Sequence, residues 1–143
     1  MLSRMIYISM AVGPVTTAVT GTILRSAQAH NAANGITGVL CQGQGVYLQV
    51  LEGERSKVDA LYARIVQDKR HRHVVVRHQE DIKTRRYGHW AMAHIDLAHA
   101  DEATNVTHAP QGLFDPYSAT ADQVMTQLDG LISSGKVMNV PVV

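Results

Sequence analysis

Gln49 is the side chain in this sequence that most needs a chemical explanation. It lies within Val46–Leu51, a segment that is otherwise apolar and reads as a buried strand. A buried amide needs partners for two N–H donors and one acceptor oxygen. Gln49 could be a core glutamine that is satisfied by the backbone or by a hydroxyl. It could also be an amide that contacts a ligand and reorients by exchanging its donor and acceptor ends.

Two further polar residues are of the types that would complete such a ligand site. Tyr7 lies in the β-branched and aromatic segment Arg4–Ser9, and its hydroxyl could pair with the amide. A strand tyrosine otherwise fills space as a large amphipathic ring. Asn31 stands near the end of a predicted helix, where it suits a helix C-terminus. It could equally offer a donor and an acceptor to a planar heterocycle.

Apolar and basic residues could frame the same ligand. Ile23 and Ile65 fall on the apolar stripes of two predicted helices, so both suit a core. Two branched side chains on facing helices would also make a flat slot for a ring. The basic run Lys69–His73 is typical of a solvated helix end, and its alternative role is contact with a ligand phosphate.

Other kinds of site find little support. Eight histidines raise the question of a metal, but His71 and His73 lack a third ligand at a matching spacing, so no metal site is predicted. Cys41 is the only cysteine, which excludes an internal disulfide or thiolate cluster within one chain and suits a reducing cytoplasm. The sequence has no G-x-G-x-x-G or Walker A pattern and no credible catalytic triad.

Composition limits the class of protein. The 143 residues are 45% hydrophobic and 17% charged, which is typical of one globular domain. The net charge of +1 predicts no general attraction to nucleic acid or to anionic membranes. The uncharged run Met5–Leu24 contains Gly13-Pro14 and four threonines, which favours a strand followed by a helix over a membrane span or a signal peptide. A cytoplasmic location is expected.

The elements that would position these residues follow a βαββαββ order. Strands are predicted at 4–9, 36–41, 46–51, from 74 onward and at 90–97, and helices from Pro14 to about Asn34 and from Ser56, as N-cap, to the basic run at 69–73. This order predicts an α+β sandwich of ferredoxin-like type, with a mixed five-stranded sheet and both helices on one face. An amphipathic helix at 120–133 would bury its apolar stripe on the free sheet face or in another subunit.

One chained pattern carries a family resemblance. It runs through Gln28–Asn31, Gly35–Leu40, Gly45–Gly53, Asp68–His71 and Arg86–Met92. These segments resemble the BLUF domain, a blue-light sensor that uses FAD. The resemblance implies a flavin-binding domain at 3–97 and a C-terminal helical extension at 98–143, as in short BLUF proteins.

The sequence departs from the family at two positions. Cys41 and Gln42 stand at the end of the second strand, where the family more often has aliphatic and aromatic residues. These substitutions could loosen that edge of the pocket or admit water.

The resemblance also implies roles for single residues. Tyr7 would give an electron, with its proton, to photoexcited flavin, and Gln49 would be the switch amide between that hydroxyl and flavin N5/C4=O. Asn31 would hold the C4=O and N3–H edge, while Ile23 and Ile65 would clamp the ring. The residues expected at the ring edge, ribityl chain or phosphate are Arg64, Asp68, Arg70 and His71.

The implied function is light sensing without catalysis. FAD, or FMN, would be bound non-covalently, and Trp90 and Met92 on the fifth strand would relay a reversible red-shifted state to the C-terminal helices or to a partner. A homo-oligomer and a downstream protein effector are the expected partners. The alternatives are a small flavin-dependent oxidoreductase and an interaction module that keeps the fold without flavin.

Overall fold

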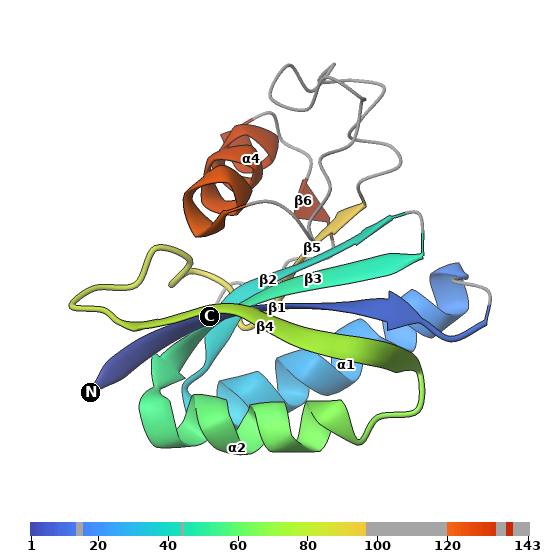
Figure 1. Cartoon of the computed structure of the whole chain (residues 1–143), viewed down its shortest axis with the longest axis horizontal. Coiled ribbons are helices and arrows are strands. Elements are labelled where there is room, and N and C mark those ends of the chain that lie inside the picture. The colour runs from blue at the N-terminus through green and yellow to red at the C-terminus, as the bar shows by residue number, and fades with distance from the viewer. Residues whose placement is uncertain (14–15, 44, 97–119, 134–136, 139–143) are drawn as a thin grey trace.

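In the part of the chain that the structure describes, a mixed sheet carries helices on both faces. The computed structural model describes residues 1–13, 16–43, 45–96, 120–133 and 137–138 (Figure 1). Within these ranges the sheet has six strands in the order β4-β1-β3-β2-β5-β6. The strands are β1 (Leu2–Ala11), β2 (Thr37–Gly43), β3 (Val46–Glu54), β4 (His71–Asp81), β5 (Ala93–Asp96) and β6 (Val137–Met138). The helices are α1 (Thr17–Asn34), α2 (Arg55–Val66) and α4 (Ala121–Ser133).

Strand pairing confirms the predicted ferredoxin-like α+β fold. β1 is antiparallel to both β3 and β4, and β2 is antiparallel to β3 but parallel to β5. α1 and α2 cover one face and α4 lies on the other (Figure 1). The sequence did not predict β6, which pairs antiparallel with β5 and makes the sheet six-stranded.

Capping residues mark both ends of α1 but not the start of α2. Thr16 caps α1, because its hydroxyl oxygen accepts from the N–H of Val19 at 3.1 Å. α1 ends at Asn34, and Gly35 follows in the left-handed conformation (φ 66°), as the Asn34-Gly35 pair predicts. The prediction of Ser56 as the N-cap of α2 is wrong. Glu54 still pairs with Leu2 in the sheet, so the helix begins directly at Arg55.

The basic run was also misplaced by the sequence prediction. α2 ends at Val66, and His71–His73 already belongs to β4, which was expected to begin at residue 74. His71 and Arg72 pair with Ala11 and Met10 of β1, so long-range pairing decides their conformation. The fifth strand is shorter than the predicted 90–97, because β5 begins at Ala93.

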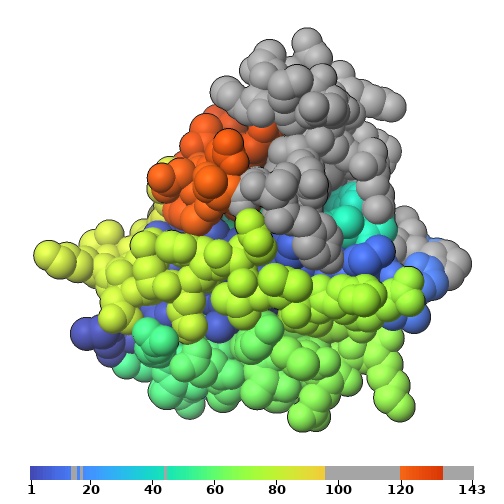
Figure 2. Space-filling view, viewed as in Figure 1, coloured from blue at the N-terminus to red at the C-terminus, as the bar shows by residue number. Residues whose placement is uncertain are grey.

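Alternate residues of the sheet build two separate cores. Ile6 and Ile8 of β1 point to the face that α4 covers, whereas Met5 and Tyr7 point toward α1 and α2. In the space-filling view, α4 (orange) stands on one side of the β4 edge and α2 (green) on the other (Figure 2). α4 buries its apolar stripe on the sheet, the first of the two places predicted. Its buried residues are Val124, Met125, Gln127, Leu128 and Leu131.

Cys41 does not lie on the pocket side of the sheet, and the effect of Cys41 and Gln42 on that edge of the pocket stays a prediction. Cys41 is fully buried in the core under α4, on the opposite face of the sheet from Tyr7. Burial raises the pKa of its thiol, which therefore stays protonated. Gln42 is half-buried.

The C-terminal part is described only in two pieces. Residues 98–119 of the predicted extension and the proposed boundary after residue 97 lie outside the described ranges. The division into 3–97 and 98–143 therefore stays a prediction. Among the helices that are described, none has the length and apolar character needed to cross a membrane.

Candidate functional site

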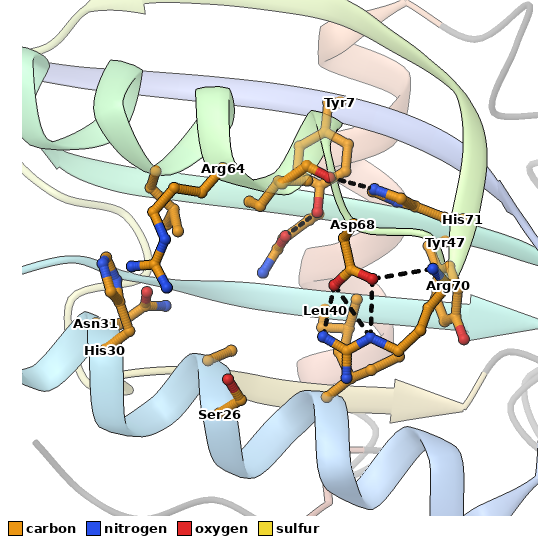
Figure 3. Close-up of a pocket in the computed structure, with 15 residues that line it drawn as sticks. Tyr7, Ser26, His30, Asn31, Leu40, Tyr47, Arg64, Asp68, Arg70 and His71 are labelled. Carbon is orange, nitrogen blue, oxygen red and sulfur yellow. Dashed lines mark hydrogen bonds and ion pairs between the residues drawn. The ribbon is translucent and has the colours of Figure 1, made fainter.

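A cavity opens between α1, α2 and the sheet, on the face opposite α4 (Figure 3). Its empty volume is about 820 Å³, open solvent at the mouth included. Every residue predicted to contact the cofactor lines it: Tyr7, Ile23, Asn31, Gln49, Arg64, Ile65, Asp68, Arg70 and His71.

Six lining residues were missed by the sequence prediction: Ser26, Ala27, His30, Leu40, Tyr47 and Leu61. The first three share a helix face with Ile23, so the helical period alone could have found them. Leu40 pairs with Gln49 across β2 and β3. Tyr47 lies two residues before Gln49 on the same strand face.

Gln49 lies at the centre of a short polar chain. Tyr7 and Gln49 are directly paired across β1 and β3, and both are buried. The Tyr7 hydroxyl donates a hydrogen bond to Gln49 Oε1, and Gln49 Nε2 lies 3.4 Å from the sulfur of Met92. Burial, and then the negative charge of Asp68, raise the pKa of Tyr7 above its usual value. The phenol therefore stays protonated and donates to the amide.

Asn31 shows that the pocket suits a polar ligand. Its side chain is fully buried, and Nδ2 donates to the carbonyl oxygen of Ala91 at 2.9 Å. Among the described residues, Oδ1 has no hydrogen-bond partner. A buried acceptor of this kind is costly unless a donor meets it. This buried acceptor and the apolar walls therefore fit a flat heterocycle with an N–H edge, and a flavin ring has such an edge.

Charged groups gather at the mouth of the cavity. Figure 3 shows the Asp68–Arg70 pair on one side and Asn31 with Arg64 on the other. Arg70 Nε lies 2.9 Å from Asp68 Oδ1, and this hydrogen bond lowers the pKa of Asp68. The arrangement leaves the carboxylate ionised and the guanidinium fixed at the edge of the pocket.

His71 is held by two neighbours. Its Nε2 lies 2.5 Å from the carbonyl oxygen of Ile65, and its Nδ1 lies 2.8 Å from Ser9 Oγ. Because the carbonyl can only accept, Nε2 carries the hydrogen, and a neutral ring then accepts from Ser9. The ring stands edge-on to Tyr7, with centroids 6.4 Å apart.

The structure separates the two residues expected to relay the signal. Met92 is fully buried and contacts Gln49, whereas Trp90 packs against the core under α4. Only Met92 is brought to the site. Neither residue lies as predicted in the fifth strand, because β5 begins after both of them.

No group of three or more His, Cys, Asp or Glu side chains in the described ranges is placed to share a metal ion. The cavity, its apolar walls and the buried acceptor of Asn31 define a small-molecule site in an α+β domain.

Comparison with known proteins gives the family. The family model for sensors of blue-light using FAD (BLUF) matches residues 2–93. The chain belongs to the BLUF family. It is thus a flavin-binding blue-light sensor domain, which has no catalytic role of its own, and this outcome favours the sensor over the oxidoreductase.

Relatives and solved structures agree with this assignment. The chain is 37% identical to photoactivated adenylate cyclase subunit alpha of Euglena gracilis over 109 residues, which are 76% of this chain and 10% of that protein. It therefore spans about a tenth of that relative. The dark-state structure of the BLUF protein BlrB has a TM-score of 0.77 at 25% identity, covering 94% of this chain and 96% of that one. A bacterial light-regulated adenylyl cyclase has a TM-score of 0.66 at 30% identity, covering 94% and 35%.

Proposed function

We propose that the cavity binds FAD and that the chain of Tyr7, Gln49 and Met92 converts blue light into a lasting structural change. The observation that carries this proposal is the double contact of Gln49, with a phenol on its oxygen and a thioether on its nitrogen. Asn31 Oδ1, buried and without a partner in the described ranges, supports the placement of the ring edge. Ile23 and Ile65 would clamp the ring. Arg64, Asp68, Arg70 and His71 would contact its edge, ribityl chain or phosphate.

When bound, the flavin supplies absorption of blue light and a strongly oxidising excited state. In this proposal Tyr7 gives an electron together with its proton, and the hydrogen bond that it donates to Gln49 Oε1 supplies a path for that proton. A hydroxyl that is buried, neutral and bonded to an amide can release and recover that proton without exchange with water.

Gln49 can store the change because its two ends are unlike. If the amide turns over, its N–H group faces the Tyr7 hydroxyl and its oxygen faces the Met92 sulfur. The sulfur is then left without its donor, so Met92 is released from the amide. Net hydrogen-bond energies of about 1 kcal/mol each suffice to bias such a two-state element.

A dark-minus-lit absorption spectrum of the purified protein tests the function. We expect a yellow protein whose flavin bands shift reversibly to the red in blue light. A protein that stays colourless after incubation with FAD would refute the proposal. Release of the flavin by denaturation and its separation by chromatography then distinguish FAD from FMN.

Gln49→Leu should keep the flavin and lose the red shift, because leucine fills a similar volume and offers no hydrogen bond. The matched control is Gln42→Leu. It makes the same change one strand away, at a side chain that does not line the cavity, and should keep the shift. An unchanged photocycle in Gln49→Leu would contradict the switch role.

The proposal also covers the molecule that reads the light-induced change. We infer that a cytoplasmic effector protein or a second copy of the chain reads the change, because the Euglena gracilis relatives are named as photoactivated adenylate cyclase subunits. Light scattering coupled to size exclusion, in the dark and under blue light, tests for the second copy. A monomer in both conditions would leave a separate protein as the reader.

A further inference from the structure

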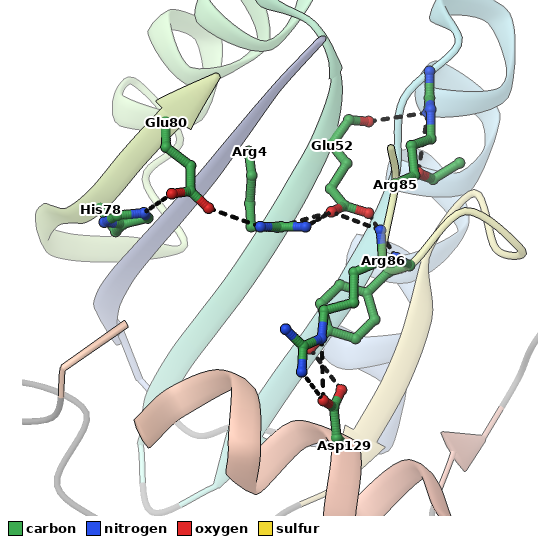
Figure 4. A network of polar contacts seen from close by, with 9 residues as sticks. Arg4, Glu52, His78, Glu80, Arg85, Arg86 and Asp129 are labelled. Atoms are coloured by element: carbon green, nitrogen blue, oxygen red, sulfur yellow. Dashed lines mark hydrogen bonds and ion pairs between the residues drawn. The ribbon is translucent and has the colours of Figure 1, made fainter. Parts of the chain in front are cut away.

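Glu52 is a buried charge that the flavin site does not use. It lies on β3, three residues after Gln49, and is fully buried. One carboxylate oxygen accepts from Arg4 Nε at 2.8 Å and from the backbone N–H of Arg86 at 3.1 Å (Figure 4). The other accepts from the backbone N–H of Tyr87 at 2.6 Å. Hydrogen bonds to a charged acceptor are the stronger kind, so this carboxylate fixes the backbone at 86–87.

The segment that Glu52 holds, residues 86–92, ends at Met92. Hydrogen bonds also hold its backbone at that second end. The carbonyl oxygens of Trp90, Ala91 and Met92 accept from Gly38 N, Asn31 Nδ2 and Gln28 Nε2, at 3.1, 2.9 and 3.1 Å. Asn31 and Gln49 both belong to the pocket, so two pocket residues contact the end of this segment. A shift at Met92 must therefore be taken up in a short stretch whose other end is bound to Glu52.

The side chains of the same two residues reach α4. The Arg86 guanidinium pairs with Asp129, with Nε 3.1 Å from the carboxylate, and the Tyr87 hydroxyl donates to the same carboxylate at 3.0 Å. Residues 86–87 thus bind the sheet through their backbone and α4 through their side chains. In Figure 4 the contacts run without a break from Glu80 through Arg4 and Glu52 to Arg86 and Asp129.

We propose that Glu52 is a positioning residue that holds Met92 against Gln49, and that Asp129 couples residues 86–92 to α4. This proposal rests on the proposed function. The light-induced change would then reach the far face of the sheet through residues 86–87. Release of Met92 by Gln49 removes a contact at one end of the segment. The strain is carried to the backbone N–H groups on Glu52 and, through the side chains, to Asp129.

Glu52→Gln tests the first part of the proposal, that Glu52 positions Met92. Glutamine keeps the shape of the side chain but turns one acceptor oxygen into an N–H donor, so it cannot serve both backbone N–H groups. We expect bound flavin and an initial red shift, with a rate of dark recovery changed by about fivefold or more, because a fivefold change corresponds to about 1 kcal/mol of barrier, the net worth of one hydrogen bond. Glu80→Gln is the matched control. It neutralises the other carboxylate on Arg4, at 2.8 Å, without touching residues 86–87, and should recover at the wild-type rate.

A second readout separates positioning from general stabilisation. By NMR, the Arg86 and Tyr87 amides should exchange slowly in the dark and faster under blue light in the wild type. A merely structural Glu52 would lower the melting temperature and leave both recovery and the light-minus-dark exchange unchanged, which would overturn the proposal. If Glu52→Gln does not fold, the wild-type exchange decides, since equal exchange in dark and light would also overturn it.

Asp129→Asn tests the second part of the proposal, that Asp129 couples residues 86–92 to α4. The Asp129 side chain is 39% exposed, so the fold tolerates this change. The variant should keep flavin, red shift and recovery, and lose the light-dependent change in amide exchange of α4. A change in α4 that persists would refute the coupling. A wild type without any red shift would instead refute the proposed function, so the two failures are distinguishable.

Discussion

Tyr7 holds its proton more tightly in the folded chain than in water. Burial removes the hydration that a phenolate needs, and the negative charge of Asp68 opposes a second negative charge nearby. The folded state therefore binds a proton over a pH range in which the unfolded chain has lost it. The stabilisation from this group is complete below the unfolded pKa near 10 and falls as the pH rises above it.

Tyr7→Phe should make stability less sensitive to alkali. Between pH 10 and 11 the free energy of unfolding of the wild type should fall by about 1 kcal/mol more than that of the variant. Urea unfolding at both pH values measures the difference. Tyr87 and Cys41, whose pKa values are also raised, remain in both proteins, so their effects cancel. Equal losses in the two proteins would contradict the pKa assigned to Tyr7.

The family resemblance selected the side chains of the pocket, because the sequence pattern alone left a purely structural interpretation open for Tyr7, Asn31 and Gln49. All three line the cavity, and their roles toward a ligand stay predictions. The outcome for Trp90 and Met92 could not be read in this way. Two residues apart in a strand would share a face, but these residues lie before β5, and the irregular backbone sends their side chains to opposite cores.

At the scale of elements, the sequence predicted periodicity better than boundaries. The apolar stripe at 120–133 predicted the bounds of α4 to within one residue, because an amphipathic period spans the whole helix. The start of α2 and the start of β4 depend on pairing with β1, which is far away in the chain. β6 is only two residues long, so it carries no periodic signal.

Gly38 is the position where an element tolerates no side chain. A Cβ there would stand 1.9 Å from the carbonyl oxygen of Val50 on the neighbouring strand β3. Gly38→Ala should therefore destabilise the fold by about 3 kcal/mol or more, because a backbone strand must move. Gly130→Ala is the control. Its Cβ would meet nothing within 4 Å in α4, and it should stabilise by about 0.5–1 kcal/mol. Chemical denaturation measures both, and a neutral Gly38→Ala would refute the close approach.

At the scale of the whole molecule, side chains pack densely on one face of the sheet and leave a cavity on the other. α4 fills the far face with its own side chains, whereas the near face keeps an open cavity with a buried acceptor of Asn31. A cavity of this kind leaves part of the stability to the ligand, since anything that binds only the folded state adds RT ln(1 + [L]/Kd).

Flavin should therefore stabilise the entire chain and not only the pocket. With free FAD at about 100 times its Kd, the free energy of unfolding should rise by about 2.7 kcal/mol, measured by urea unfolding of flavin-depleted protein with and without FAD. At the same FAD concentration, Asn31→Ala should reduce this increment, because the ligand loses its buried acceptor and its Kd rises. Asn34→Ala, one helical turn further on and outside the cavity lining, loses a 2.8 Å bond to the His30 carbonyl and should lower stability without changing the increment. Equal increments in the two variants would show that Asn31 does not meet the ring.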